Sequence, residues 1–325
     1  MLSKEDKELI NATRHFTKEN PALSWWYVSS SFILLIAAIT GTFIFTDWPM
    51  RLLSSIVAGI LIVRSFILYH DFMHGTILRN SKLADFLFTT YGLLIMTPKR
   101  VWKETHNYHH AHTAKIATSH IGSYKMVTIH MWKRMNAWQR LGYKFIRHPI
   151  NFVLAIFTMF AYGMCIAPIQ RNIKQNWDSL LALVLHVILA TILIIYTGYN
   201  GYFFSLLLPL MIGATIGSYL FYAQHNFPGV DVKPINEWNF VYASLASSSF
   251  MKMGAIMNWI TGNIGYHHIH HLNSKIPFYR LPEAMENIPE LQHPITTTLK
   301  PTDIYQCFQL KLWDPENHKM VGYTH

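Results

Sequence analysis

Long apolar runs dominate the hydrophobic pattern of the chain, and five of them are candidates for membrane helices. Residues 25–46 contain no charged residue. As a helix they would span about 33 Å, which is enough for the core of a bilayer. Residues 51–69 form a second run, interrupted by Arg64. The remaining runs are 152–169, 180–196 and 202–222. A shorter run at 83–97 cannot span comfortably, which indicates an interfacial or re-entrant helix.

The connections between these runs predict a topology. A tight turn joins 25–46 to 51–69, so the two runs pair as a hairpin whose ends lie on the same side. The segment 98–149 is rich in Lys and Arg, and the positive-inside rule therefore places it in the cytoplasm. The connection at 198–201 carries no charge and suits the opposite side.

The later runs raise a problem of parity. If all three crossed the bilayer, the residues after 222 would lie on the opposite side from His106. Arg147 precedes 152–169, and Arg171 and Lys174 follow it, whereas Lys and Arg are rare in short outer loops. The run 152–169 is therefore predicted to lie at the interface without crossing.

Composition supports a membrane class. The chain is 51% hydrophobic and only 14% charged, whereas a soluble domain carries about 25% charged residues. Cytoplasmic loops account for the net charge of +10, and no nucleic-acid-binding motif accompanies it. Cys165 and Cys307 form no CxxC pair, so neither a thiolate zinc site nor a disulfide framework is indicated. The polar N-terminus lacks the apolar core of a signal peptide.

The compositional anomaly is histidine, of which the chain has 19. Three clusters, HDFMH, HNYHH and HHIHH, repeat the spacing i, i+4 or i, i+3, i+4. On a helix these offsets place the imidazoles on one face. The spaced residues are His70, His74, His106, His109, His110, His267, His270 and His271.

Eight spaced histidines exceed the needs of one zinc ion, which takes four protein ligands in structural sites and three in catalytic ones. The clusters therefore predict two metal ions. Imidazole suits iron, copper, nickel or zinc, and the spacing does not choose among them.

The predicted fold class is an all-α integral membrane protein in which 1–325 form a single domain. Four transmembrane helices in two hairpins, with interfacial helices, support a cytoplasmic helical cap that holds a di-metal site.

The three clusters resemble the histidine boxes HxxxH, HxxHH and HxxHH of membrane fatty acid desaturases. The order of the boxes and the intervening apolar hairpin match that superfamily over nearly the whole chain. The sequence KLWDPENHKMVGY at 311–323 is similar to the closing segment of acyl-lipid desaturases of the omega-6 type. The resemblance implies that the eight box histidines are iron ligands. It also implies a ninth ligand, His225 in FYAQHNF, after the last spanning run.

Other residues beside the boxes have supporting roles in this interpretation. Asp71 is expected to orient a ligand imidazole as a second-layer carboxylate. Asn263 is expected either to do the same or to cap a helix. His112 and His268 lie off the ligand faces and are expected to point elsewhere, and His186 is expected to be a hydrogen-bonded packing residue inside a spanning run.

The resemblance also implies a reaction. Removing hydrogen from an unactivated methylene requires a cofactor, which the protein positions and shields. The family uses a non-haem di-iron centre, O2 as co-substrate and two external electrons to introduce a double bond into a fatty acyl lipid. No HPGG motif of a fused cytochrome b5 occurs, so a separate ferredoxin or cytochrome b5 type donor is expected. Lys99, Arg100, Lys133 and Arg134 offer it a basic surface, although anionic lipid explains the same charge equally well.

Three other functions compete with this one. A hydroxylase or ketolase of the same superfamily, acting on a lipid, carotenoid or alkane, would use the same irons, although the alkane hydroxylase signature NYxxHYG is missing. A zinc-dependent membrane hydrolase would not need so many ligands, and HExxH is missing. A metal transporter would need more ionisable residues inside the spans than Arg64 and His186. The third box begins with His267 rather than glutamine, which argues against a front-end desaturase.

Overall fold

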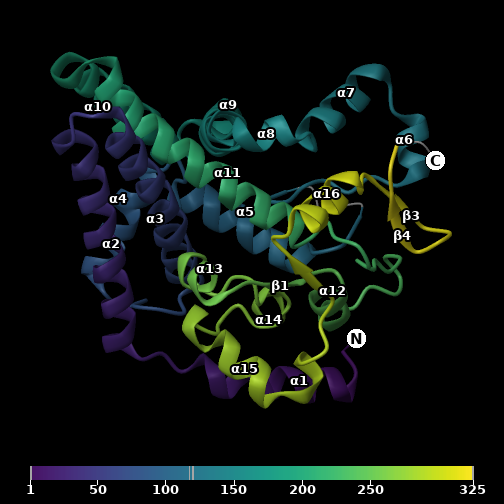
Figure 1. Ribbon diagram of the computed structural model, residues 1–325. Coiled ribbons are helices and arrows are strands. Elements are labelled where there is room, and N and C mark those ends of the chain that lie inside the picture. The colour runs from purple at the N-terminus through teal and green to yellow at the C-terminus, as the bar shows by residue number, and fades with distance from the viewer. Residues whose placement is uncertain (1, 117, 119–120, 324–325) are drawn as a thin grey trace. The chain divides into compact units, whose positions relative to one another are not determined.

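The computed structural model describes residues 2–116, 118 and 121–323, and it is mostly helical (Figure 1). The chain forms two compact units, each built from separate stretches of sequence. Unit 1 comprises Met1–Lys18, Thr105–Asn151 and Tyr219–His325, and unit 2 comprises Glu19–Glu104 and Phe152–Ser218. The assignment of residues 1–325 to a single domain stays a prediction.

Unit 2 contains most of the apolar sequence. Its helices are α2 (Pro21–Ile44), α3 (Trp48–His74), α4 (Lys82–Leu94), the π-helix η2 (Ile156–Ile166), α9 (Ala167–Asn172), α10 (Trp177–Tyr202) and the π-helix η3 (Phe203–Leu207). The boundary between the units falls inside α5 (Lys99–His112), α8 (Pro149–Val153) and α11 (Leu208–Ala223).

Local signals define both ends of α3. The Asp47 side chain accepts a hydrogen bond from the backbone N–H of Met50 (3.1 Å), which caps the first turn. Gly75 ends the helix with a φ of 67°, a left-handed conformation that glycine adopts without strain. The helix is longer than the predicted run 51–69, so His70 and His74 lie within its last turns.

Helix α2 packs along α3 (Figure 1). The buried Arg64 of α3 donates from Nε to Oγ of Ser31 (2.8 Å) and lies over the ring of Tyr27. These contacts give the buried guanidinium a hydrogen-bond acceptor and an aromatic face inside the second apolar run. The other face of α2 exposes large apolar side chains such as Trp26 (67% exposed) and Ile36 (62%), as expected of a helix that faces lipid.

Three helical stretches in the described part of the chain are long and apolar enough to cross a membrane: Pro21–Ile44, Trp48–His74 and Trp177–Ala223. The third contains both predicted runs 180–196 and 202–222. It is interrupted by a kink at Gly198, whose φ of 68° and ψ of 178° are not helical. The helical character of the runs is confirmed, whereas their arrangement as four spans in two hairpins stays a prediction.

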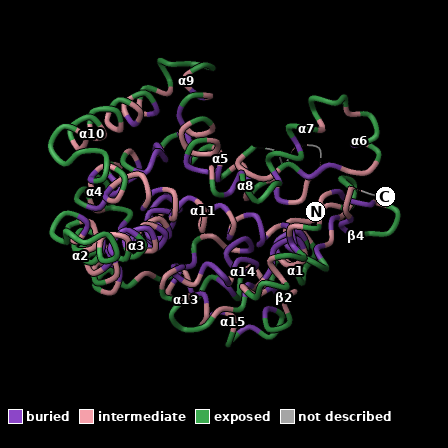
Figure 2. The backbone as a smooth tube through the Cα atoms, turned by 45° about the horizontal axis from the view of Figure 1, so that its top comes forward, coloured by how far each residue is buried: buried purple, intermediate pink, exposed green. Residues whose placement is uncertain are grey.

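Unit 1 contains shorter elements. Its helices are α1 (Lys4–Thr13), η1 (Arg14–Thr17), α6 (Ile129–Arg134), α7 (Ala137–Ile146), α12 (Phe240–Ala246), α13 (Ala255–Ile260), α14 (His267–Leu272), η4 (Phe278–Arg280), α15 (Leu281–Asn287), η5 (Pro289–Leu291) and α16 (Pro301–Gln309). Every residue of α14 is buried (Figure 2). Helix α14 packs against α12.

Unit 1 also contains two small sheets, so the fold is mostly helical, as predicted, but not strictly all-α. Strand β1 (Phe250–Lys252) pairs in parallel with β2 (Thr296–Thr298). Strand β3 (Leu312–Asp314) pairs antiparallel with β4 (Lys319–Val321). Each strand has three residues, which is too short for the alternating pattern by which strands are predicted.

The crossing of α3 and α11 within unit 2 depends on two glycines. A Cβ at Gly59 would lie 2.6 Å from Cβ of Ile212, and a Cβ at Gly213 would lie 2.7 Å from Cγ2 of Ile62. We therefore expect Gly59→Val or Gly213→Val to lower the free energy of unfolding by about 1–3 kcal/mol through overpacking. Thermal unfolding of the detergent-solubilised protein measures the change.

Gly217→Val is the matched control, because a Cβ there meets no atom within 4 Å. Equal unfolding midpoints for all three variants would contradict the close crossing.

Candidate metal centre

Two helices of unit 1 present the predicted histidines at helical spacing. The second half of α5 carries His106, His109 and His110, and α14 carries His267 and its neighbours at i+3 and i+4. His225 follows α11 by two residues, and its backbone N–H donates to the carbonyl of Tyr222 (3.1 Å). Three separate stretches of sequence therefore supply the histidines of this unit.

These side chains gather into two neighbouring groups. In the first, Nε2 of His110 lies 3.0 Å from Nε2 of His106 and 3.1 Å from Nε2 of His270. The rings of His110 and His271 stack at 4.3 Å and connect this group to the second.

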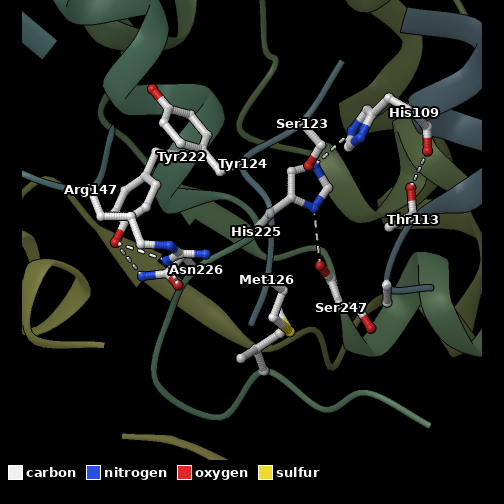
Figure 3. A pocket seen from close by; sticks show the side chains of 12 residues that line it. His109, Thr113, Ser123, Tyr124, Met126, Arg147, Tyr222, His225, Asn226 and Ser247 are labelled. Carbon is white, nitrogen blue, oxygen red and sulfur yellow. Dashed lines mark hydrogen bonds between the residues drawn. The ribbon is translucent and has the colours of Figure 1, made fainter. Parts of the chain in front are cut away.

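The second group consists of four histidines whose candidate ligand nitrogens all lie within 4.8 Å of one another. Nε2 of His225 lies 3.1 Å from that of His109 and 2.9 Å from that of His267 (Figure 3 shows His109 and His225). Nε2 of His267 in turn lies 3.2 Å from Nε2 of His271. The same ring nitrogen of each residue is thus directed toward a common point.

The spacing of the nitrogens fits metal coordination. A ligand imidazole nitrogen lies about 2.1 Å from a first-row metal ion such as zinc, so two such ligands at a right angle lie about 3.0 Å apart. The nitrogen pairs in both groups are 2.9–3.2 Å apart. Each group therefore has the donor spacing of neighbouring positions around one ion.

Burial keeps these imidazoles in the neutral form that binds metals. Removal from water lowers the pKa of His225 to about 4, against the opposing effect of its hydrogen bond to Ser247. The pKa of His271 is also well below its usual range, because of burial and then of the neighbouring histidines. Both side chains are neutral at pH 7.

Hydrogen bonds to the other ring nitrogen select the tautomer. Nδ1 of His225 donates to the backbone carbonyl of Ser247 (3.1 Å), which leaves the lone pair on Nε2 (Figure 3). Nδ1 of His271 lies 3.2 Å from Oγ1 of Thr113, and that hydroxyl donates to the carbonyl of His109 (2.9 Å). The role of Thr113 was not among the sequence predictions, although its place four residues after His109, just beyond the end of α5, could have indicated it.

The first histidine pair lies in unit 2. His70 and His74 are both buried on α3, with ring centroids 4.6 Å apart. Oδ1 of Asp71 lies 3.1 Å from Nδ1 of His70, which is the contact expected of an orienting carboxylate. The ring of Trp102 packs against both imidazoles at 5.5 and 6.1 Å. As a pair, these histidines have the proximity that chelation requires.

Three other histidines have different surroundings. Nδ1 of His112 lies 2.9 Å from the carbonyl of Tyr108, and the two rings stack. Nε2 of the buried His268 lies 3.3 Å from the carbonyl of Leu291. Nδ1 of His186 lies 2.9 Å from the carbonyl of Ala182, one turn earlier in α10. Neither metal group of unit 1 includes any of them.

Asn263 lies in a turn before α14, in a left-handed conformation with a φ of 55°. Its side-chain amide donates to the carbonyl of Phe278 (3.1 Å). This bond connects the turn to η4. The expected role of Asn263 in orienting a histidine stays a prediction.

Comparisons with known proteins place this geometry in context. A sequence model of the fatty acid desaturase family matches residues 46–298. The chain is 29% identical to a fatty acid desaturase of Bacillus subtilis over 278 residues, which cover 85% of this chain and 78% of that protein. It is 24% identical to an omega-3 fatty acid desaturase of Caenorhabditis elegans (98% and 78% covered) and to an sn-1 oleoyl-lipid 12-desaturase of Synechocystis (84% and 79% covered).

Thr113→Val is expected to loosen the second histidine group. The substitution preserves the side-chain shape but removes the oxygen beside Nδ1 of His271, so we expect the free energy of unfolding to fall by about 1–2 kcal/mol. We also expect a soluble chelator to remove bound metal several-fold faster. Thr113→Ser retains the hydroxyl and is the control, and equal chelation rates for the two variants would contradict the role of the hydroxyl.

Proposed function

The chain belongs to the fatty acid desaturase family, and we propose that its nine clustered histidines hold the two iron ions with which it desaturates a fatty acyl lipid. The proposed ligands are His70, His74, His106, His109, His110, His225, His267, His270 and His271. Within unit 1, His109, His225, His267 and His271 would hold one of the two ions. The observation that carries the proposal is the approach of Nε2 atoms to 2.9–3.2 Å in two neighbouring groups of unit 1. The i, i+4 pair of α3 supports the assignment of His70 and His74.

The choice of iron rests on the family resemblance, and the reaction agrees with it. An O2-dependent oxidoreductase that removes hydrogen from an acyl chain needs a redox-active metal, which excludes zinc as the working ion. The balanced reaction converts –CH2–CH2–, O2, two electrons and two protons into –CH=CH– and two molecules of water. The irons would supply the activation of O2 and the removal of hydrogen, which no side chain can perform.

The protein's own residues bind, orient and shield the centre. The neutral imidazoles contribute lone pairs and no charge. The Ser247 carbonyl and the Thr113 hydroxyl hold two ligand rings in the tautomer that exposes Nε2, and Asp71 holds a third ring. Burial of α14 and of His109 excludes bulk water from the centre. These residues therefore position the metals and take no part as acids or bases.

The chain is a membrane protein, and we propose a multi-pass topology for it. Four spans at about 25–46, 51–69, 180–196 and 202–222 would leave both termini and all histidine boxes in the cytoplasm. The segments 83–97 and 152–169 would lie at the interface. The ten Lys and Arg residues between positions 98 and 149 support a cytoplasmic location for that stretch.

A separate electron donor of the ferredoxin or cytochrome b5 type would supply the two electrons. Of the four basic residues expected to receive it, Lys99 forms an ion pair with Asp85, and Arg100 forms one with Glu104. Lys133 and Arg134 are exposed on α6. This difference favours α6 as the docking site of an acidic donor.

Expression in a host that lacks desaturases tests the activity. Analysis of lipid methyl esters by mass spectrometry is expected to reveal new double bonds with the native chain. We expect His225→Ala to reduce them at least about 100-fold, because the second ion would lose a ligand that no neighbour can replace. His112→Ala is the matched control and should retain most of the activity, since its ring packs on Tyr108.

Two results would contradict the proposal. Hydroxylated or keto products in place of double bonds would indicate the alternative chemistry of the superfamily. Equal double-bond yields from the His225→Ala and native chains would exclude His225 as a ligand.

A further inference from the structure

A small cavity of about 30 Å³ lies in unit 1 beside the second histidine group. Figure 3 shows His109, His225 and Thr113 on one side of it and Arg147, Tyr222 and Asn226 on the other. The volume suits one particle of the size of a water molecule or a monatomic ion. The cavity is therefore too small for a substrate but large enough for a single bound species.

The guanidinium of Arg147 is the main charged group at this cavity, and the residue is only 2% exposed. It donates to Oδ1 of Asn226 (2.8 Å), to the carbonyl of Lys125 (3.0 Å) and to the hydroxyl of Tyr222 (3.4 Å). It also lies over the rings of Tyr143 and Tyr222. All of these partners are electrically neutral, and Nε has no hydrogen-bond partner among the described residues.

The surroundings add positive charge rather than negative. None of the described residues that line the cavity is acidic, and the chain has no Asp or Glu between Glu104 and Asp178. The Lys311 ammonium donates to the carbonyl of Arg147 (3.0 Å). Burial and the nearby guanidinium lower the pKa of Lys311 to about 8, so it remains mostly protonated at pH 7. Buried cations without a counter-charge are strongly unfavourable.

We propose that this cavity binds one small monovalent inorganic anion, such as chloride, with the Arg147 guanidinium as its principal ligand. Hydroxyl groups of lining residues such as Ser123 are additional hydrogen-bond donors. The anion supplies the negative charge that the protein itself lacks at this position. An ordered water molecule would satisfy Nε but would leave the charge uncompensated.

The position of the site connects it to the metal centre. Arg147 holds Asn226, and the Asn226 amide donates to the hydroxyl of Tyr222 (2.8 Å) and to the carbonyl of Cys307 (2.8 Å). His225 lies between these two anchored residues in the chain. An anion that stabilises Arg147 therefore stabilises the segment that carries His225. Only this consequence rests on the proposed metal role of His225; the anion site does not.

Thermal unfolding in defined salts tests the anion site. The full chain in detergent is titrated with sodium chloride or bromide against sodium gluconate at constant ionic strength. We expect a saturable rise of the unfolding midpoint by several degrees with either halide. A midpoint that is the same in chloride and gluconate would indicate a water molecule only and would overturn the proposal. A rise that is equally large with sulfate would indicate a general salt effect and would also overturn it.

Substitutions locate the effect. Arg147→Met should abolish the halide dependence, and Arg140→Met, in the helix α7 that precedes Arg147, should preserve it. Because Arg147→Met also removes three hydrogen bonds, Arg147→Lys provides a second test that keeps a positive charge at this position. A buried cation that still lacks a counter-charge should retain a halide response, so Arg147→Lys should respond to halide and Arg147→Met should not. Equal halide responses from the two variants would overturn the proposal.

Metal retention gives a separate measurement of the connection to His225. Iron content after dialysis is expected to be several-fold higher in chloride than in gluconate. If the iron content is the same in both salts but chloride still raises the unfolding midpoint, the anion site exists but does not stabilise the segment that carries His225. Absence of bound iron in both salts would instead contradict the proposed function.

A different observation supports a second inference, on the surface of α7. This helix begins with a capping box in which Asn136 and Gln139 bond each other's backbone N–H groups. Tyr143 is its one buried residue, and it packs against a small core with Trp132 and Leu312. The helix is therefore held to unit 1 along a single narrow face.

The remaining surface of α7 is apolar and basic. Trp138, Leu141 and Phe145 lie at i, i+3 and i+7 on one face and are 81%, 57% and 41% exposed. The exposed Lys144, three residues after Leu141, lies beside this face. Large aromatic and aliphatic side chains beside lysine are the composition of helices that lie in the plane of a bilayer surface.

We infer that this face of α7 lies on the surface of an anionic bilayer. Charge complementarity indicates an anionic bilayer as the partner of this face, because the long stretch without acidic residues around α7 attracts anionic headgroups. Chain continuity supports it as well, since α7 leads through α8 into the apolar helix η2. The contact would fasten the metal-binding unit to the membrane that holds the acyl substrate.

Depth measurements in nanodiscs test this inference. Single cysteines at Trp138 and Leu141 carry an environment-sensitive fluorophore, and the native Cys165 and Cys307 are buried. Lipid-borne bromine is expected to quench both labels, and more strongly when the disc contains anionic lipid. Gln139→Cys, about 100° around the helix from position 138, is the control and should respond to aqueous iodide. Iodide quenching of all three labels, or protection that depends on protein concentration or on an added ferredoxin, would overturn the inference.

Discussion

The close packing of neutral, buried imidazoles determines how the metal-binding unit is built. Nε2 atoms 2.9–3.2 Å apart cannot all be hydrogen-bonded to one another, because each neutral ring has one donor and one acceptor nitrogen. Such an arrangement is stable when cations take the lone pairs. Each supporting contact, from the Ser247 carbonyl to the Thr113 hydroxyl, acts by fixing which nitrogen is available.

The need to hold these imidazoles in place explains the different roles of the residues around them. Helical spacing lets one short helix supply several ligands. In α14 this requires burial of polar side chains, since all six of its residues are buried and four of them are histidines. His268 belongs to this helix but turns to the Leu291 carbonyl and stabilises the helix within its surroundings. Asn226 and Tyr222 hold the chain on both sides of His225, which has no helical partner of its own.

Much of this could be predicted from sequence because its signals are periodic. Apolar length indicated the helices α2, α3, α10 and α11, and the offsets within the boxes indicated which histidines share a face. His225 has no spacing partner, and only the resemblance of its surroundings to a family pointed to it. The kink at Gly198 and the three-residue strands have no pattern long enough to detect. From the sequence, Arg147 is one more basic residue of a loop. Its burial cannot be predicted, because the segments that bury it are distant in the chain and leave no local signal.

Two irons with nitrogen ligands at the histidine groups can be detected by metal analysis combined with X-ray absorption at the iron edge of the purified chain. We expect two irons per chain, each bound mainly by imidazole nitrogens at about 2.1 Å. A single zinc per chain, or an iron shell made mainly of carboxylate oxygen, would contradict it.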